Sequence, residues 1–135
     1  MKQSVEEVQG FMDREFPGHG IKINSIEKQT SLITKEVGQG DLRPGNTISG
    51  PTMMSLVDTA IYVAIIGELG LTQAVTTHLS IDFLKKPDGA KNVIGKGTLI
   101  KISRSSVFGH VELFSQGCTD IIAFATVNYA LPRKK

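Results

Sequence analysis

The chain has 135 residues, and its 15 basic and 13 acidic side chains leave a net charge of +2. This length fits one domain over residues 1–135, large enough to fold without a metal or disulfides. The near balance of charge argues against a nucleic-acid-binding protein. The single cysteine, Cys118, excludes an internal disulfide and favours a reducing, cytoplasmic location.

Neither a metal site nor a membrane anchor is expected. The three histidines are scattered, and no H-x-x-x-H or C-x-x-C spacing occurs. The N-terminus lacks the basic-then-apolar pattern of a secretion signal. The most apolar stretch, residues 51–66, is shorter than the roughly 20 residues of a membrane span and carries Asp58 in its middle.

The first third of the chain predicts a helix, a hairpin and a loop. A capping-box pattern at residues 4–7 starts an amphipathic helix that continues to about Glu15. His19 falls in the turn that follows, as a solvated loop residue. From Ile21 to Val37 apolar residues recur with period two, which predicts a hairpin. Residues 38–46, rich in glycine, are expected to form a loop.

Residues 50–67 predict a long helix that is apolar on nearly every side and therefore buried. Pro51 suits its first turn, and Gly67 and Gly70 mark its end. The polar residues fall on one stripe, since they are three or four positions apart: Thr52, Ser55, Asp58, Thr59 and Tyr62. Asp58 lies too deep for a cap, so it has either a structural hydrogen-bonding role or a catalytic one.

Four strands are predicted after the helix, over residues 75–84, 93–103, 107–115 and 120–131. One long helix followed by an antiparallel meander predicts an α+β fold with the sheet curled around the helix. Residues 82–104 form the one basic segment of note, including Lys85, Lys86, Lys101 and Arg104. These cations are either solvated strand ends or a site for phosphates.

The candidate reactive groups are a carboxylate on the predicted helix and the backbone N–H groups at the start of that helix. The Gly50 N–H can stabilise an oxyanion, while Asp58 can activate water or attack directly, a pair that suits acyl transfer. This order of elements, with x-G-x-x-x-x-x-L-x-D over residues 49–58, resembles the hotdog-fold acyl-CoA thioesterases of the PaaI-like group. The resemblance covers nearly the whole chain.

The resemblance implies a hotdog fold and hydrolysis of a small, aromatic or medium-chain acyl thioester, with coenzyme A as part of the substrate and no other cofactor. It makes Gly50 the oxyanion donor and Asp58 the base or nucleophile. Thr76, eighteen residues after Asp58, would help to hold the water, although an ordinary strand threonine is an equal interpretation. The family joins two sheets, which implies a dimer or a dimer of dimers with each site between subunits.

Departures from the family pattern concern substrate binding. Ser49 stands where the family has histidine, and Pro51 replaces a second glycine. Arg43 stands where an asparagine often polarises the thioester carbonyl, and Asn46 is the alternative for that role. Arg43 could instead bind a carboxylate or a phosphate.

With Arg43, Asn46 and Ser49, the predicted substrate-binding residues include Lys101 and Arg104, which would bind the nucleotide phosphates of coenzyme A. Two other functions stay open. One is a hotdog hydratase or dehydratase, which the absence of a histidine on or just before the central helix disfavours. The other is a non-catalytic module that binds or senses acyl-CoA.

Overall fold

The computed structural model describes residues 2–132. Its helices are α1 (Val5–Glu15) and α2 (Gly50–Leu69), with a short 3-10 helix, η1 (Gln39–Asp41), between them. The strands are, in chain order, β1 (Ile21–Glu27), β2 (Thr30–Lys35), β3 (Leu42–Arg43), β4 (Thr47–Ile48), β5 (Val75–Phe83), β6 (Val93–Ile102), β7 (Ser106–Ser115) and β8 (Ile121–Ala130).

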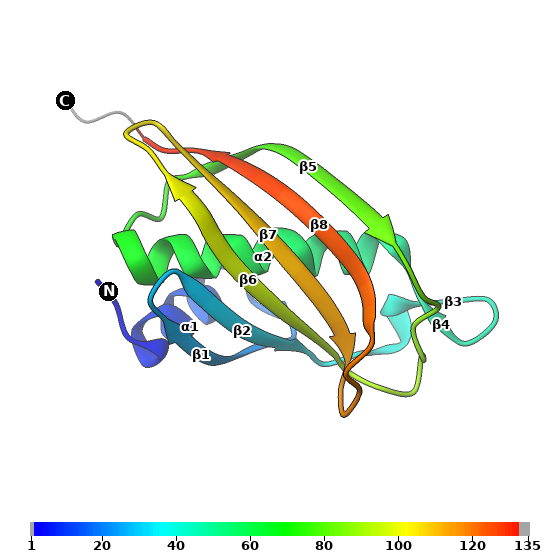
Figure 1. Ribbon diagram of the computed structural model, residues 1–135. Coiled ribbons are helices and arrows are strands. Elements are labelled where there is room, and N and C mark those ends of the chain that lie inside the picture. The colour runs from blue at the N-terminus through cyan, green and yellow to red at the C-terminus, as the bar shows by residue number, and fades with distance from the viewer. Residues whose placement is uncertain (1, 133–135) are drawn as a thin grey trace.

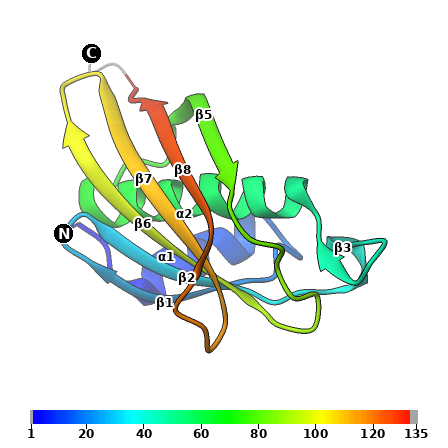
Figure 2. The same ribbon diagram turned by 45° about the vertical axis from the view of Figure 1, so that its right-hand side comes forward.

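Six strands form one antiparallel sheet in the order β1-β2-β6-β7-β8-β5. The sheet curves around α2, which runs along its concave face (Figures 1 and 2). Inward-facing residues of the central strands, such as Val111 and Val127, are fully buried against the helix. The α+β hotdog arrangement predicted from the sequence is therefore confirmed.

Helix α2 is longer and less enclosed than predicted. It continues to Leu69 and ends at Gly70, whose φ of 71° gives the left-handed cap. Gly67 lies inside the helix, where an added Cβ would come within 2.5 Å of Ile26. Met54 is 43% exposed and Asp58 is only half-buried, because the sheet covers one side of the helix and leaves the polar stripe open.

By length and composition, α2 alone among the described helices could cross a membrane, yet 56% of its apolar window is buried inside the fold. Leu56, Val57, Ala60 and Ile61 on its sheet-facing side are at most 1% exposed. It is thus the core helix around which the sheet closes.

The two edges of the sheet differ. At the β1 edge, α1 packs Val8 and Met12 into the core. The Gln9 side chain bonds the strand itself, accepting from Ile23 N (2.8 Å) and donating to Ile21 O (3.1 Å). At the other edge, β5 is exposed along most of its length, and β8 is its one partner strand among residues 2–132.

The predicted loop over residues 38–46 carries more structure than expected. It contains η1, and its end forms a small hairpin, in which β3 pairs with β4. This hairpin lies beside the start of α2, away from the main sheet (Figure 2). Thr47 Oγ1 donates to Pro87 O (2.8 Å) and Gly89 N donates to Asn46 O (3.0 Å), so the hairpin is fastened to the loop after β5.

Candidate active site

Asp58 lies at the middle of α2 beneath the open edge of the sheet. Its Oδ1 accepts hydrogen bonds from Thr76 Oγ1 (2.5 Å) and from the Tyr129 hydroxyl (2.7 Å). Within residues 2–132 no side chain or backbone group donates to the other carboxylate oxygen, Oδ2. The carboxylate is therefore held at one oxygen and open at the other.

Thr76 and Tyr129 reach the same carboxylate oxygen because they are cross-strand partners on β5 and β8. Side chains directly opposite one another project to the same face of the sheet. A bulge between Thr76 and His78 bends the edge strand at this point. Thr76 was predicted to help hold the water, and in the structure its hydroxyl bonds Asp58 itself. Tyr129 was not predicted as part of the site.

Tyr129 is a buried donor, with 3% of its surface exposed. Burial raises the pKa of this phenol well above its ordinary value, and the hydrogen bond to the Asp58 carboxylate raises it further. The ring stacks on Tyr62 with centroids 6.3 Å apart, and the Tyr62 hydroxyl donates to Thr72 O (2.6 Å). Tyr129 is thus a protonated hydrogen-bond donor held in one orientation.

The start of α2 offers one free backbone donor. Ser49 is the N-cap: its Oγ accepts from Thr52 N (3.3 Å), and its carbonyl accepts from Met53 N (3.2 Å). Pro51 has no N–H. In the described part of the chain the Gly50 N–H has no acceptor, so it can donate to a developing negative charge.

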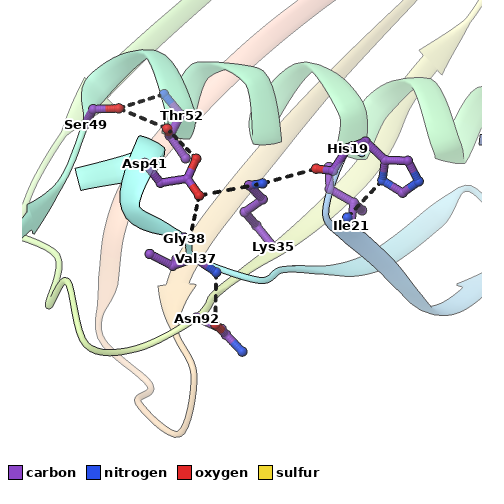
Figure 3. A network of polar contacts seen from close by, with 9 residues as sticks. All are labelled: His19, Ile21, Lys35, Val37, Gly38, Asp41, Ser49, Thr52 and Asn92. Atoms are coloured by element: carbon purple, nitrogen blue, oxygen red, sulfur yellow. Dashed lines mark hydrogen bonds and ion pairs between the residues drawn. The ribbon is translucent and has the colours of Figure 1, made fainter. Parts of the chain in front are cut away.

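Asp41, which the sequence did not single out, holds the preceding loop against the helix (Figure 3). Its Oδ1 accepts from Thr52 Oγ1 (3.0 Å) and its Oδ2 from Gly38 N (2.8 Å). Its backbone carbonyl accepts from Ser49 N (2.8 Å). These contacts fix the direction of β3 and therefore the position of Arg43.

A pocket of about 620 Å³ opens between the β3–β4 hairpin, the start of α2 and the loop after β5. Arg43, Gly50, Lys85 and Lys86 all line it. Asn46 is exposed at the hairpin tip, with a φ of 55°. The structure thus brings two predicted site residues, Gly50 and Arg43, into one pocket, and Asp58 is not among the residues that line it.

Lys101 and Arg104 lie at the other end of the molecule. The end of β6, the start of β7 and the end of β8 are adjacent in the sheet, and Arg104 lines a second pocket there, of about 900 Å³, with Leu69 and Leu71. Lys85 and Lys86 follow the far end of β5. The basic segment predicted from the sequence is therefore divided between the two ends of one chain.

His19 is not the solvated loop residue that was expected. Its Nδ1 accepts from Ile21 N (2.8 Å), and its Nε2 lies 2.8 Å from Asp13 Oδ1. The hydrogen bonds from His19 and then Gln9 lower the pKa of Asp13. In the described residues no group of three or more His, Cys, Asp or Glu side chains could hold a metal ion.

This arrangement, a long helix inside a curved antiparallel sheet with a carboxylate at its middle and a free N–H at its start, defines a hotdog-fold protein. The family model described as "Thioesterase superfamily" matches residues 45–122. The chain belongs to the thioesterase superfamily, and the resemblance to hotdog thioesterases is confirmed.

Solved structures agree with this assignment. A putative thioesterase from a Silicibacter species is 30% identical, with a TM-score of 0.91 over 98% of this chain and 94% of that one. A mutant of the phenylacetic acid degradation protein PaaI from Thermus thermophilus is 21% identical, with a TM-score of 0.73 over 91% and 99%. A Streptococcus mutans protein bound to acetyl-CoA is 23% identical, with a TM-score of 0.74 over 85% and 90%. No curated protein sequence matches the chain.

Proposed function

We propose that the protein hydrolyses an acyl thioester of coenzyme A to the free acid and coenzyme A. The observation that carries the proposal is Asp58, with Oδ1 held by two hydroxyl donors and Oδ2 open, on a helix whose Gly50 N–H is free. Membership of the thioesterase superfamily supports it. The similar Streptococcus mutans structure with acetyl-CoA supports coenzyme A thioesters as the substrate class.

In the proposed reaction Asp58 Oδ2 removes a proton from water, whose oxygen bonds to the thioester carbon. The carbonyl oxygen becomes an oxyanion that accepts from Gly50 N–H. The C–S bond then breaks, and the proton passes from Asp58 to the departing thiolate. In a second route Asp58 Oδ2 attacks the same carbon, the C–S bond breaks, and coenzyme A leaves as a thiolate that takes a proton from water. The hydroxide left from that water hydrolyses the resulting anhydride to the free acid and the Asp58 carboxylate. Thr76 and Tyr129 orient the carboxylate in both routes.

We further propose that each site forms between two copies of the chain. Eight residues of helix separate Asp58 from Gly50, about 12 Å at roughly 1.5 Å per residue. One tetrahedral centre cannot contact both groups across that distance. A second copy pairing along the open edge of β5 would bring Asp58 of one chain to Gly50 of the other, in a dimer or a dimer of dimers in the cytoplasm.

The proposed pairing of two chains also decides which of the predicted substrate-binding residues can contact one substrate. Lys101 and Arg104 lie too far from Gly50 of their own chain to share its substrate, so a role with coenzyme A phosphates requires the second copy. Ser49 already bonds Thr52 as the helix cap, and Asn46 stays the candidate for a polar contact at the hairpin tip.

Release of free thiol from a panel of acyl-CoAs tests the proposal, with hydration of crotonyl-CoA followed in parallel. We expect thiol release and no hydration, since the partners of Asp58 in the described residues are Thr76 and Tyr129 and include no imidazole. Hydration without thiol release would identify a hydratase. Tight acyl-CoA binding without either reaction would identify a binding module.

A further inference from the structure

The pocket beside Gly50 has an apolar floor and a positively charged rim. Ile48, Met53, Phe83 and Leu84 supply apolar surface, and the latter two are 50% and 60% exposed. Around them stand the three cations Arg43, Lys85 and Lys86, and none of the lining residues is acidic. Such a pocket matches a ligand with a short apolar body and an anionic end.

Two of the three cations are available to a ligand. Lys85 Nζ lies 3.1 Å from Asp120 Oδ2, in an exposed ion pair. Across residues 2–132, neither Arg43 nor Lys86 is paired with an acid. The start of α2 adds further positive potential to the same pocket. Like charges held together without an acid favour a bound anion, and a guanidinium can bind a carboxylate through two parallel hydrogen bonds.

The pocket is held in shape before any ligand binds. The bonds from Thr47 Oγ1 to Pro87 O and from Gly89 N to Asn46 O join its two walls. At Gly89 an added Cβ would lie 2.5 Å from Asn46 O, so only glycine permits this approach. Arg43 therefore projects from a hairpin that is fastened at its tip as well as at its base.

Distance decides which anion fits. A pocket of this size is roughly 10 Å across. The pantetheine arm places the pyrophosphate of coenzyme A roughly 15 Å from the thioester, by ordinary bond lengths. A thioester whose oxygen lies at Gly50 N–H thus carries its phosphates outside the pocket. A carboxylate at the end of a short acyl chain stays within it.

We infer that this pocket binds the acyl group and selects acyl chains that end in a carboxylate, the half-thioesters of short dicarboxylic acids such as succinate or glutarate. The apolar floor takes the methylene groups, and Arg43 binds the carboxylate with help from Lys86. This inference rests on the proposed thioester hydrolysis and assigns its substrate class.

The test compares succinyl with butyryl thioesters, each made with coenzyme A and with N-acetylcysteamine, which has no phosphates. We expect kcat/KM to favour succinyl by about tenfold or more with both thiols. Arg43→Gln should lower the succinyl-to-butyryl ratio by about tenfold. The control Lys28→Gln, which removes a charge from the exposed β1–β2 turn, should leave the ratio unchanged.

A wild-type preference for butyryl would overturn the inference. So would an Arg43→Gln defect that is equal for both acyl groups and disappears with N-acetylcysteamine, since Arg43 would then bind a phosphate. Hydrolysis of butyryl-CoA reports the proposed function separately. If no thioester is hydrolysed, calorimetry with S-carboxypropyl-coenzyme A and S-butyl-coenzyme A measures the same selectivity, and equal affinities would exclude it.

Discussion

The two edges of the sheet differ in whether the chain itself covers the free backbone groups of the outermost strand. At the β1 edge the chain closes the sheet itself: α1 packs over the strand, and Gln9 bonds its free backbone groups. At the β5 edge nothing in the described chain does so, and Val75 and Phe83 are 60% and 50% exposed. Exposed edge strands invite pairing with another strand, which folded proteins usually prevent.

The difference separates stability from activity. Thr76 and the Asp58 carboxylate lie at the open edge, and no candidate catalytic residue lies at the closed one. Substitutions at the closed edge should therefore reduce stability and leave activity unchanged. Substitutions at the open edge should reduce activity and leave stability largely unchanged.

Asp58→Asn should have the largest effect, a fall in kcat of about a hundredfold or more with KM altered less. The amide keeps the shape but can neither accept a proton from water nor attack a thioester. Steady-state kinetics and a melting curve measure the two properties, with Asp82→Asn on the exposed face of β5 as the control. Near-normal kcat in a folded Asp58→Asn protein would refute the catalytic role.

Gln9→Ala should act on the closed edge and reduce the free energy of unfolding by about 1–3 kcal/mol, because Ile21 O and Ile23 N lose their partner. Urea denaturation measures this loss. Activity of the folded protein should match wild type. A loss of kcat with no loss of stability would contradict the separation of roles between the edges.

Val75→Glu should weaken self-association, since it replaces exposed apolar surface on β5 by a charge that repels its own copy. Each chain would lose the apolar surface that Val75 buries in the proposed interface, which predicts a rise in the dimer dissociation constant of about tenfold or more. Light scattering and thiol release are measured over the same concentrations, with Lys22→Glu on β1 as the control. An active wild-type monomer would rule out the shared site.

Tyr129→Phe should lower kcat about fivefold, because Asp58 Oδ1 loses one of its two donors while the packing on Tyr62 is kept. It should also change the alkaline stability. The folded pKa of Tyr129 is raised above the unfolded value of 10.0, so its contribution is complete below that pH and is lost as pH rises beyond it.

The free energy of unfolding is therefore measured at neutral pH and at pH values above about 10. Its fall between the two should be smaller for Tyr129→Phe than for wild type. Tyr62→Phe is the matched control, since burial raises the pKa of Tyr62 as well but its hydroxyl bonds Thr72 O instead of Asp58. Equal kcat values for Tyr129→Phe and wild type would show that Thr76 alone holds the carboxylate.

The sequence predicted the main helices and strands well, because hydrophobic periodicity reports on them. Family spacing marked Asp58 and Thr76 as candidate site residues, and the hydrogen bond between them is a finding of the structure. The sequence did not indicate Tyr129. Alternation along β8 places Tyr129 on the inner face with Val127, yet its pairing with Thr76 depends on the bulge at Thr76/His78, which no local pattern reveals. The central helix is the buried core helix that was predicted, but the exposure of Met54 on it was not foreseen, since composition does not show which side a sheet leaves uncovered.

The contacts of Asp41 and the pocket beside Gly50 could not be predicted from the sequence either. Asp41 contacts Thr52 and Gly38 through a fold of the loop that brings η1 against the start of α2. Arg43 and Lys86 come together only because the hairpin and the loop after β5 are fastened to each other. Such contacts between distant segments depend on tertiary structure rather than on spacing along the chain.

The order of the strands also affects how the protein folds. Strand β5 does not pair with β6, which follows it in the chain, but with β8, the last strand of the β6–β7–β8 meander. Closing so long a loop loses chain entropy before the β5–β8 contacts stabilise it. Contacts between segments this far apart in the chain therefore form slowly. The meander can form from neighbouring strands, while the Thr76–Tyr129 pair must await β8. Refolding should therefore restore the circular dichroism signal before it restores enzymatic activity.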